Sequence, residues 1–170
     1  MKYKLISQQT FEKARMEISK ANSVASSKKQ TKEINSSKEK IVFTSDDDEL
    51  NRKVLEKLKI DVLLINLSKR KDFQKQRNSG FNQVLAKIAK KNKIHIGINL
   101  DEIIKANKFE KSKILARVKQ NIFLCNKAKL KMVFVVQDKN NLRNIYDLKS
   151  LGLVLGMSTG MCKGIEIVSF

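Results

Sequence analysis

The 170-residue sequence contains no proline, no tryptophan, one histidine and two cysteines. Because His95 has no second histidine to join it, a zinc site or a histidine-rich phosphoesterase centre is disfavoured. It alternates with isoleucines in IHIGIN, which favours a structural role over that of a general base. Cys125 and Cys162 form no C-x-x-C pair, so we expect buried thiols rather than a disulfide or a metal site.

Long apolar runs are also absent. A transmembrane helix needs about 20 consecutive apolar residues, and no segment approaches that length. The first thirteen residues, MKYKLISQQTFEK, lack the apolar stretch of a signal peptide. We therefore expect a cytoplasmic protein without a membrane partner.

Acidic residues are few compared with basic ones. The chain has 36 Lys and Arg against 17 Asp and Glu, which gives a formal net charge of +19. A domain this basic repels itself unless a polyanion neutralises it, and nucleic acid is the usual polyanion. The basic side chains concentrate in residues 69–93 and 105–131, with a further block in residues 1–40. The charge distribution therefore predicts a nucleic-acid-binding protein.

Hydrophobic patterning predicts strands and helices in alternation along one domain, residues 1–170. The strands are continuous apolar runs, which indicates a parallel sheet covered by helices. The pattern fits an open doubly wound sheet or a barrel, and a barrel would be a reduced one because eight-fold barrels are longer. Residues 23–40, rich in Ser and Lys, predict a polar mobile segment. The predicted strands are 3–6, 41–45, 60–66, 94–99, 131–137, 153–157 and 165–168, and the helices are 8–22, 46–59, 79–92, 110–127 and 145–151.

The helix predicted over residues 79–92 has an apolar face and a basic face. Its apolar residues follow the i, i+3, i+4, i+7 spacing of a helix that packs on a sheet. Ser79 is the predicted N-cap. The outward lysines are Lys87 and Lys90, with Lys91 at the border. The apolar face consists of Phe81, Val84, Leu85, Ile88 and Ala89.

Two other stretches have a structural and a chemical interpretation. SDDDEL, residues 45–50, could hold a metal, but Asp46 followed by Glu49 fits a helix capping box better. GMSTGMCKG, residues 156–164, could hold a phosphate with Lys163, although an ordinary turn between a strand and a helix is favoured. We therefore predict no catalytic residues, metal ligands or cofactor from either stretch.

The loop KRKDFQKQRNSG, residues 69–80, is the strongest functional candidate. It follows the end of a predicted strand, where α/β proteins usually place function. Its basic and amide side chains suit RNA phosphates, and its aromatic residue, Phe73, can stack on a base. The alternative is a solvated charged loop, which the overall charge disfavours.

Three blocks of the sequence resemble one known family. These are SGFNQVLAKIAKKNKIHIGINLDEII, the helix and strand in NKFEKSKILARVKQNIFLCNKAKLKMVFVVQ, and LRNIYDLKSLGLVLGM. Together they resemble the ribonuclease P protein component 3 family, the archaeal and eukaryotic barrel subunit, over residues 41–170. Either Arg70 or Arg77 could match the family's loop arginine. The chain has Leu100, Asp101 and Glu102 where the family usually has Leu-Arg-Pro, so one expected basic contact is missing.

This resemblance implies a TIM-barrel-like fold, reduced or incomplete at its N-terminal end. It implies a subunit of the endoribonuclease that removes the 5′ leader from precursor tRNA, in which the RNA is the catalyst. The implied partners are ribonuclease P RNA, protein component 2 and other subunits of the complex, with precursor tRNA contacted indirectly. The alternatives are a generic RNA-binding or ribosome-associated protein, and a barrel enzyme acting on a small phosphorylated substrate through residues 156–164.

The predicted RNA-facing residues combine the loop, the following helix and the second basic block. Ser79, Gly80, Arg143 and Asp147 are predicted to be structural or RNA-facing, with Arg143 and Asp147 pairing at i and i+4. The predicted RNA-binding residues are Lys69, Arg70, Lys71, Lys75, Arg77, Lys87, Lys90, Lys91, Arg117 and Lys163.

Overall fold

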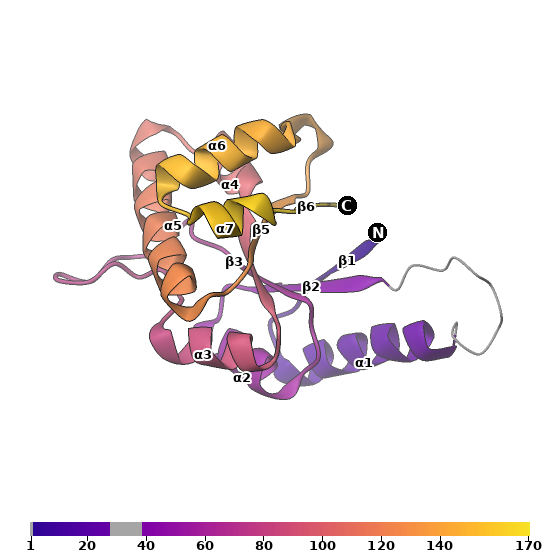
Figure 1. The fold of residues 1–170 in the computed structure, drawn as a ribbon. Helices are drawn as coiled ribbons and strands as arrows, with labels where there is room; N and C mark the ends of the chain where they lie inside the picture. Colours follow the sequence, from indigo (N-terminus) through magenta and orange to yellow (C-terminus); the bar gives the residue numbers. More distant parts are fainter. Residues whose placement is uncertain (1, 28–38) are drawn as a thin grey trace.

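The computed structural model describes residues 2–27 and 39–170 as strands alternating with helices (Figure 1). The strands are β1 (Tyr3–Ser7), β2 (Lys40–Ser45), β3 (Val62–Ile65), β4 (His95–Asn99), β5 (Met132–Val136) and β6 (Ile167–Ser169). The helices are α1 (Phe11–Ser27), α2 (Asp48–Lys57), α3 (Gln83–Lys91), α4 (Leu100–Lys105), α5 (Lys108–Ala128), α6 (Ile145–Leu155) and α7 (Thr159–Lys163), with a 3₁₀ turn at Lys139–Asn141.

The six described strands form one parallel sheet in the order β1-β2-β3-β4-β5-β6. The order in space is therefore the order in the chain, without the reversal that defines a doubly wound sheet. The sheet curls into a half-barrel with helices around its outside (Figure 1). This confirms the TIM-barrel-like prediction, with six described strands instead of eight.

The two faces of the sheet are packed differently. Outward side chains such as Phe43 and Phe134 join the main core beneath the helices. The inner face is filled by a separate valine-rich cluster, so the half-barrel has a packed interior. A Cβ atom at Gly97 would lie 3.0 Å from side-chain atoms of Leu64 and Val135, which shows how tightly β3, β4 and β5 approach. The inner cluster consists of Val42, Val62, Leu64, Val133, Val135 and Val168.

The open edges of the half-barrel are linked by one carboxylate. Glu166 lies directly before β6, and its Oε2 is 3.4 Å from the Lys40 Nζ on β2. The same oxygen accepts a hydrogen bond of 3.4 Å from the Tyr3 hydroxyl on β1. Polar side chains therefore connect the first and last strands where no backbone ladder joins them.

Several predicted boundaries were wrong. The strand predicted at 153–157 is helical up to Leu155, because Leu148, Gly152 and Leu155 bury one helical face. Helix α1 continues to Ser27, so residues 23–27 of the predicted mobile segment are helical, and residues 28–38 lie outside the described residues.

Two predicted N-caps were also wrong. Helix α3 begins at Gln83, and the N-cap is Asn82, whose side chain accepts from the Leu85 N–H. Ser79 is buried before the helix, where its hydroxyl donates to the Phe81 carbonyl. The shift in phase leaves Val84 56% exposed instead of packed on the sheet. At α2 the cap is Asp47 rather than Asp46.

The two cysteines have the environment expected of buried thiols. Cys125 and Cys162 are free and buried. Burial raises the pKa of the Cys125 thiol to about 12, which leaves it protonated and unreactive near neutral pH. Among the described helices, none combines the length and the hydrophobicity that a bilayer-spanning segment requires.

Candidate nucleic-acid interface

The loop between β3 and α3 projects from the carboxyl end of the sheet as a short hairpin (Figure 1). Phe73 and Gln76 exchange backbone hydrogen bonds, 2.8 Å from the Phe73 N–H and 3.3 Å from the Gln76 N–H. We call residues 71–77 the hairpin arm. The strand ladder ends at Ile65, so the arm depends on side chains at its base to hold its position.

Arg70 is the first of two arginines that brace the base of the arm. Its Nη1 and Nη2 atoms bind both carboxylate oxygens of Asp48 at 2.9 and 2.7 Å, and its Nε donates to the Asn66 carbonyl at 2.6 Å. Only 9% of the side chain is exposed. This bidentate pair therefore uses Arg70 inside the protein, contrary to the predicted RNA contact.

Arg117 on α5 is the second brace. Its Nε lies 3.0 Å from the Asp72 Oδ1, and its Nη1 and Nη2 donate to the Leu67 and Arg70 carbonyls at 2.8 and 2.7 Å. The side chain is 1% exposed, so the predicted RNA contact of Arg117 was wrong. The hydrogen bond from Arg117 holds the pKa of the Asp72 carboxyl below its usual range, helped by the backbone N–H of Asn78.

Ser79 and Gly80 complete the base of the arm. Ser79 is 2% exposed. Gly80 has a φ of +66°, and a Cβ atom there would lie 2.5 Å from the Arg70 Nη2. Position 80 therefore requires glycine for two reasons. Its backbone is left-handed, and the Arg70 guanidinium fills the space that a side chain would need.

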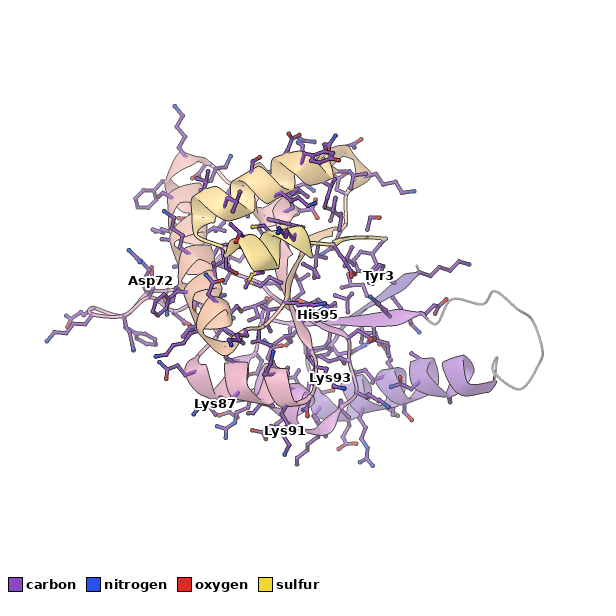
Figure 2. All side chains as sticks on the ribbon, viewed as in Figure 1. Tyr3, Asp72, Lys87, Lys91, Lys93 and His95 are labelled. Carbon is purple, nitrogen blue, oxygen red and sulfur yellow. The ribbon has the colours of Figure 1, made fainter. Side chains whose placement is uncertain are left out.

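The remaining predicted cations are exposed. Figure 2 places Lys87 and Lys91 on the outward side of α3, where both are exposed. Lys90 is exposed too, although its Nζ donates to the Lys129 carbonyl at 2.6 Å. These lysines follow the loop in the sequence, so the exposed cations of the loop and of α3 come from consecutive segments of the chain. The exposed cations of the loop are Lys69, Lys71, Lys75 and Arg77.

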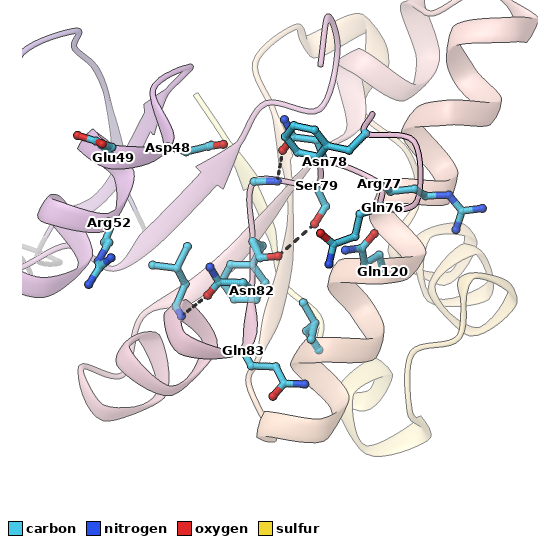
Figure 3. Close-up of a pocket in the computed structure, with 15 residues that line it drawn as sticks. Asp48, Glu49, Arg52, Gln76, Arg77, Asn78, Ser79, Asn82, Gln83 and Gln120 are labelled. Atoms are coloured by element: carbon cyan, nitrogen blue, oxygen red, sulfur yellow. Dashed lines mark hydrogen bonds between the residues drawn. The ribbon is translucent and has the colours of Figure 1, made fainter. Parts of the chain in front are cut away.

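A groove of about 500 Å³ lies beside the arm (Figure 3). The arm and the start of α3 line one part of it, while the first turns of α2 and the middle of α5 line the rest. Half of its ten polar side chains are amides, and the others are two acids, two arginines and a serine. The labelled residues in Figure 3 are Asp48, Glu49, Arg52, Gln76, Arg77, Asn78, Ser79, Asn82, Gln83 and Gln120.

The C-terminal predictions were less successful. Arg143 precedes α6, and its Nη1 donates to the Asn140 and Leu142 carbonyls at 3.1 and 3.0 Å. Within the described part of the chain it makes no ion pair with Asp147, so the predicted i to i+4 pair is wrong. Lys163 is exposed on α7, a five-residue helix that follows α6 rather than a strand. The strand-to-helix turn required for a phosphate site is therefore missing.

Sequence reasoning missed the role of the two acids that follow β4. The Glu102 carboxylate accepts from the backbone N–H of Leu67 at 2.9 Å and from the Ser68 hydroxyl at 2.7 Å. Asp101 accepts from the Gln137 N–H and the Asn141 amide, both at 2.6 Å. These carboxylates hold the neighbouring loops where the resemblance implied a basic residue. In the sequence, the position of these two acids just after a buried strand was the feature that could have indicated this role.

These features define a singly wound α/β half-barrel with a braced, basic loop at the carboxyl end of its strands. Over residues 2–27 and 39–170, no cluster of His, Cys, Asp or Glu is arranged to hold a metal ion. The sequence profile of the family described as RNase P subunit p30 matches residues 11–166, so the chain belongs to that family. The match includes α1, which lies outside the range of the resemblance.

One curated relative and one solved structure illustrate the similarity. The chain is 28% identical to ribonuclease P protein component 3 of Methanococcus vannielii over 112 residues, 66% of this chain and 44% of that protein. It is also similar to a chain in a cryo-EM structure of archaeal ribonuclease P with mature tRNA, with a TM-score of 0.72 and 20% identity. That similarity covers 91% of this chain and 60% of the other. The chain thus spans less than two thirds of either relative's length.

Proposed function

We propose that this protein is an RNA-binding subunit of ribonuclease P that helps to fold the RNA which removes the 5′ leader from precursor tRNA. The observation that carries the proposal is the braced hairpin arm with its exposed cations, in a chain that belongs to the RNase P subunit p30 family. The RNA supplies the catalysis, and this chain supplies positive charge in a fixed arrangement.

The physical reason is preorganisation of the charge. Arg70 and Arg117 hold the base of the arm, so Lys71, Lys75 and Arg77 extend from a positioned backbone. A braced loop loses less conformational entropy on binding than a free one. The net charge of +19 adds long-range attraction to any polyanion.

The proposal includes partners and a compartment. We propose ribonuclease P RNA and protein component 2, together with other subunits, as direct partners in the cytoplasm, with precursor tRNA contacted indirectly. A generic RNA-binding or ribosome-associated protein is the second candidate, because the arm's phosphate contacts alone carry no sequence information. The small-phosphate enzyme loses its support, since residues 156–164 do not form the required turn.

Sequencing the RNA that crosslinks to the protein in cells separates these candidates. The tagged full chain is crosslinked by ultraviolet light, purified under denaturing conditions, and the bound RNA is sequenced. Enrichment of one structured RNA, the ribonuclease P RNA, is the expected result. Dominant ribosomal RNA would contradict the proposal in favour of the second candidate.

A further inference from the structure

We propose that the groove beside the hairpin arm binds one unpaired nucleobase of an RNA, with Phe73 as the stacking surface and free glutamine amides toward the base edge. This inference rests on the proposed function and adds a base-binding site to a surface otherwise defined by phosphate contacts. Figure 3 shows the groove with its polar lining.

Phe73 carries the stacking part of the inference. Its side chain is 68% exposed, yet its backbone is fixed by the hydrogen bonds to Gln76 across the arm. The adjacent Asp72 is tied to Arg117, which anchors this end of the arm to α5. An exposed aromatic ring on a braced backbone is the arrangement that stacks an unpaired base.

Three amides supply the edge recognition. The side chains of Gln76, Gln83 and Gln120 make no hydrogen bond within the described residues, and all three line the groove. In contrast, Asn78 accepts from Arg70 and Asn82 caps α3. An amide offers both donors and an acceptor, which matches the mixed edge of a nucleobase.

The charge inside the groove favours a base over a phosphate. Among the charged residues that line the groove, Asp48 is paired with Arg70 and Arg52 with Glu56, which leaves Arg77 and Glu49 with opposite charges. The Glu49 carboxylate is 85% exposed and lies 3.8 Å from the Lys53 Nζ, so in water this long pair leaves Glu49 able to weaken the binding of a phosphate. Lys71 and Lys75 of the arm are exposed and lie outside the groove lining, so an RNA strand would place its backbone there and turn a base inward.

The groove is large enough for one unpaired base. A volume of about 500 Å³ lies within the range of small-ligand sites. Bases within a duplex have both faces covered by their neighbours, which leaves no face for Phe73 to stack on. The substrate class is therefore a bulged, looped or terminal nucleotide of RNA.

A fluorescent base tests this inference on the full-length protein. The probe is a ten-nucleotide oligouridine with one central 2-aminopurine, whose fluorescence falls when the base stacks. Wild-type protein should quench it, whereas Phe73→Ala should lose most of the quenching and bind about tenfold more weakly. Phe109→Ala is the matched control, because Phe109 is also 68% exposed but lies outside the groove lining.

The outcomes separate this inference from the proposed function. Salt-dependent binding by Phe73→Ala with wild-type affinity and quenching would overturn the base site and leave the RNA-binding surface intact. Equal losses in Phe73→Ala and Phe109→Ala would also overturn it. If wild-type protein bound neither this probe nor any structured RNA in a salt-dependent manner, the proposed function itself would fail. Weaker binding of the probe when it is annealed to its complement would support the preference for an unpaired base, and equal or tighter binding would overturn that preference.

Discussion

Arg117 and Asp72 form an ion pair of 3.0 Å between Nε and Oδ1, which joins α5 to the hairpin arm across 45 residues of sequence. The two arginines closest to the arm's base, Arg70 and Arg117, therefore organise the protein rather than the RNA. The exposed cations of the arm, Lys71, Lys75 and Arg77, take no part in this bracing and are the proposed RNA contacts.

Replacing Arg117 by Met should destabilise the protein. The change leaves the Leu67 and Arg70 carbonyls and the Asp72 carboxylate without their shared donor, at a cost of ~3 kcal/mol. The free energy of unfolding in urea measures the effect. Lys119→Met, an exposed neighbour on α5, should change it by less than ~0.5 kcal/mol. Equal stability of Arg117→Met and wild type would refute the bracing role.

Acid should weaken the attachment of the arm through Asp72. Because its pKa is lowered in the folded protein, mainly by the Arg117 hydrogen bond, its contribution to stability is complete above the unfolded pKa of about 4. That contribution is lost as the pH falls through the lower folded pKa. Asp72→Asn should therefore flatten the dependence of unfolding free energy on pH between about 5 and 2. A pH profile identical to wild type would exclude Asp72 as a contributor.

Gly80→Ala should disturb the base of the hairpin arm, where Gly80 packs against the Arg70 guanidinium. The new Cβ would lie 2.5 Å from the Arg70 Nη2, and the φ of +66° is unfavourable for alanine. We expect a loss of ~1–3 kcal/mol in unfolding free energy and weaker RNA binding. Gly160→Ala is the matched control, since a Cβ there has no neighbour within 4 Å. A similar effect of both substitutions would show that the close approach to Arg70 is unimportant.

The salt dependence of RNA binding counts the phosphate contacts of the arm. Changing Lys71, Lys75 and Arg77 together to Ala should reduce the slope of log K against log salt by about 2, at ~0.7 for each contact with a single strand. A control triple variant removes the exposed cations of α1, which lie away from the arm (Figure 1). That variant should leave the slope nearly unchanged. Equal slopes for the arm variant and wild type would contradict the assignment. The control residues are Lys13, Arg15 and Lys20.

His95 should make the protein less stable in mild acid. Burial is the main cause that lowers its pKa, with Lys40 and Lys131 adding to the effect and Glu166 and Asp61 opposing it. Since the unfolded chain binds the proton more readily, stability falls as the pH drops below about 6.5. His95→Gln should remove the part of this decline that lies between pH 6.5 and the folded pKa. Parallel pH profiles for His95→Gln and wild type above pH 5 would contradict this prediction.

Periodicity and apolar runs were sufficient for most of the fold. The five strands from 3–6 to 131–137 were found because parallel strands buried on both faces read as continuous apolar runs. The same rule failed at LVLGM, where the apolar run belongs to a helix that buries Gly152 against Met157 and Cys162. Local sequence does not distinguish these cases, since a short apolar run fits either element.

The basic loop predicted at residues 69–80 lies between β3 and α3 in the structure, whereas the bracing roles of individual side chains were not predicted. Composition could identify residues 69–80 as basic, yet it gave Arg70 and Arg117 the same role as Lys71 and Lys75. The difference lies in long-range partners, Asp48 and Asp72, which no local pattern connects to the arginines.

The measurement that tests the central proposal most directly is removal of the 5′ leader from a precursor tRNA by material captured natively on the tagged chain. We predict specific leader cleavage that is abolished when the captured material is first treated with nuclease, because the RNA is the proposed catalyst. Intact, soluble bait that captures no such activity would contradict assignment of this chain to a working ribonuclease P.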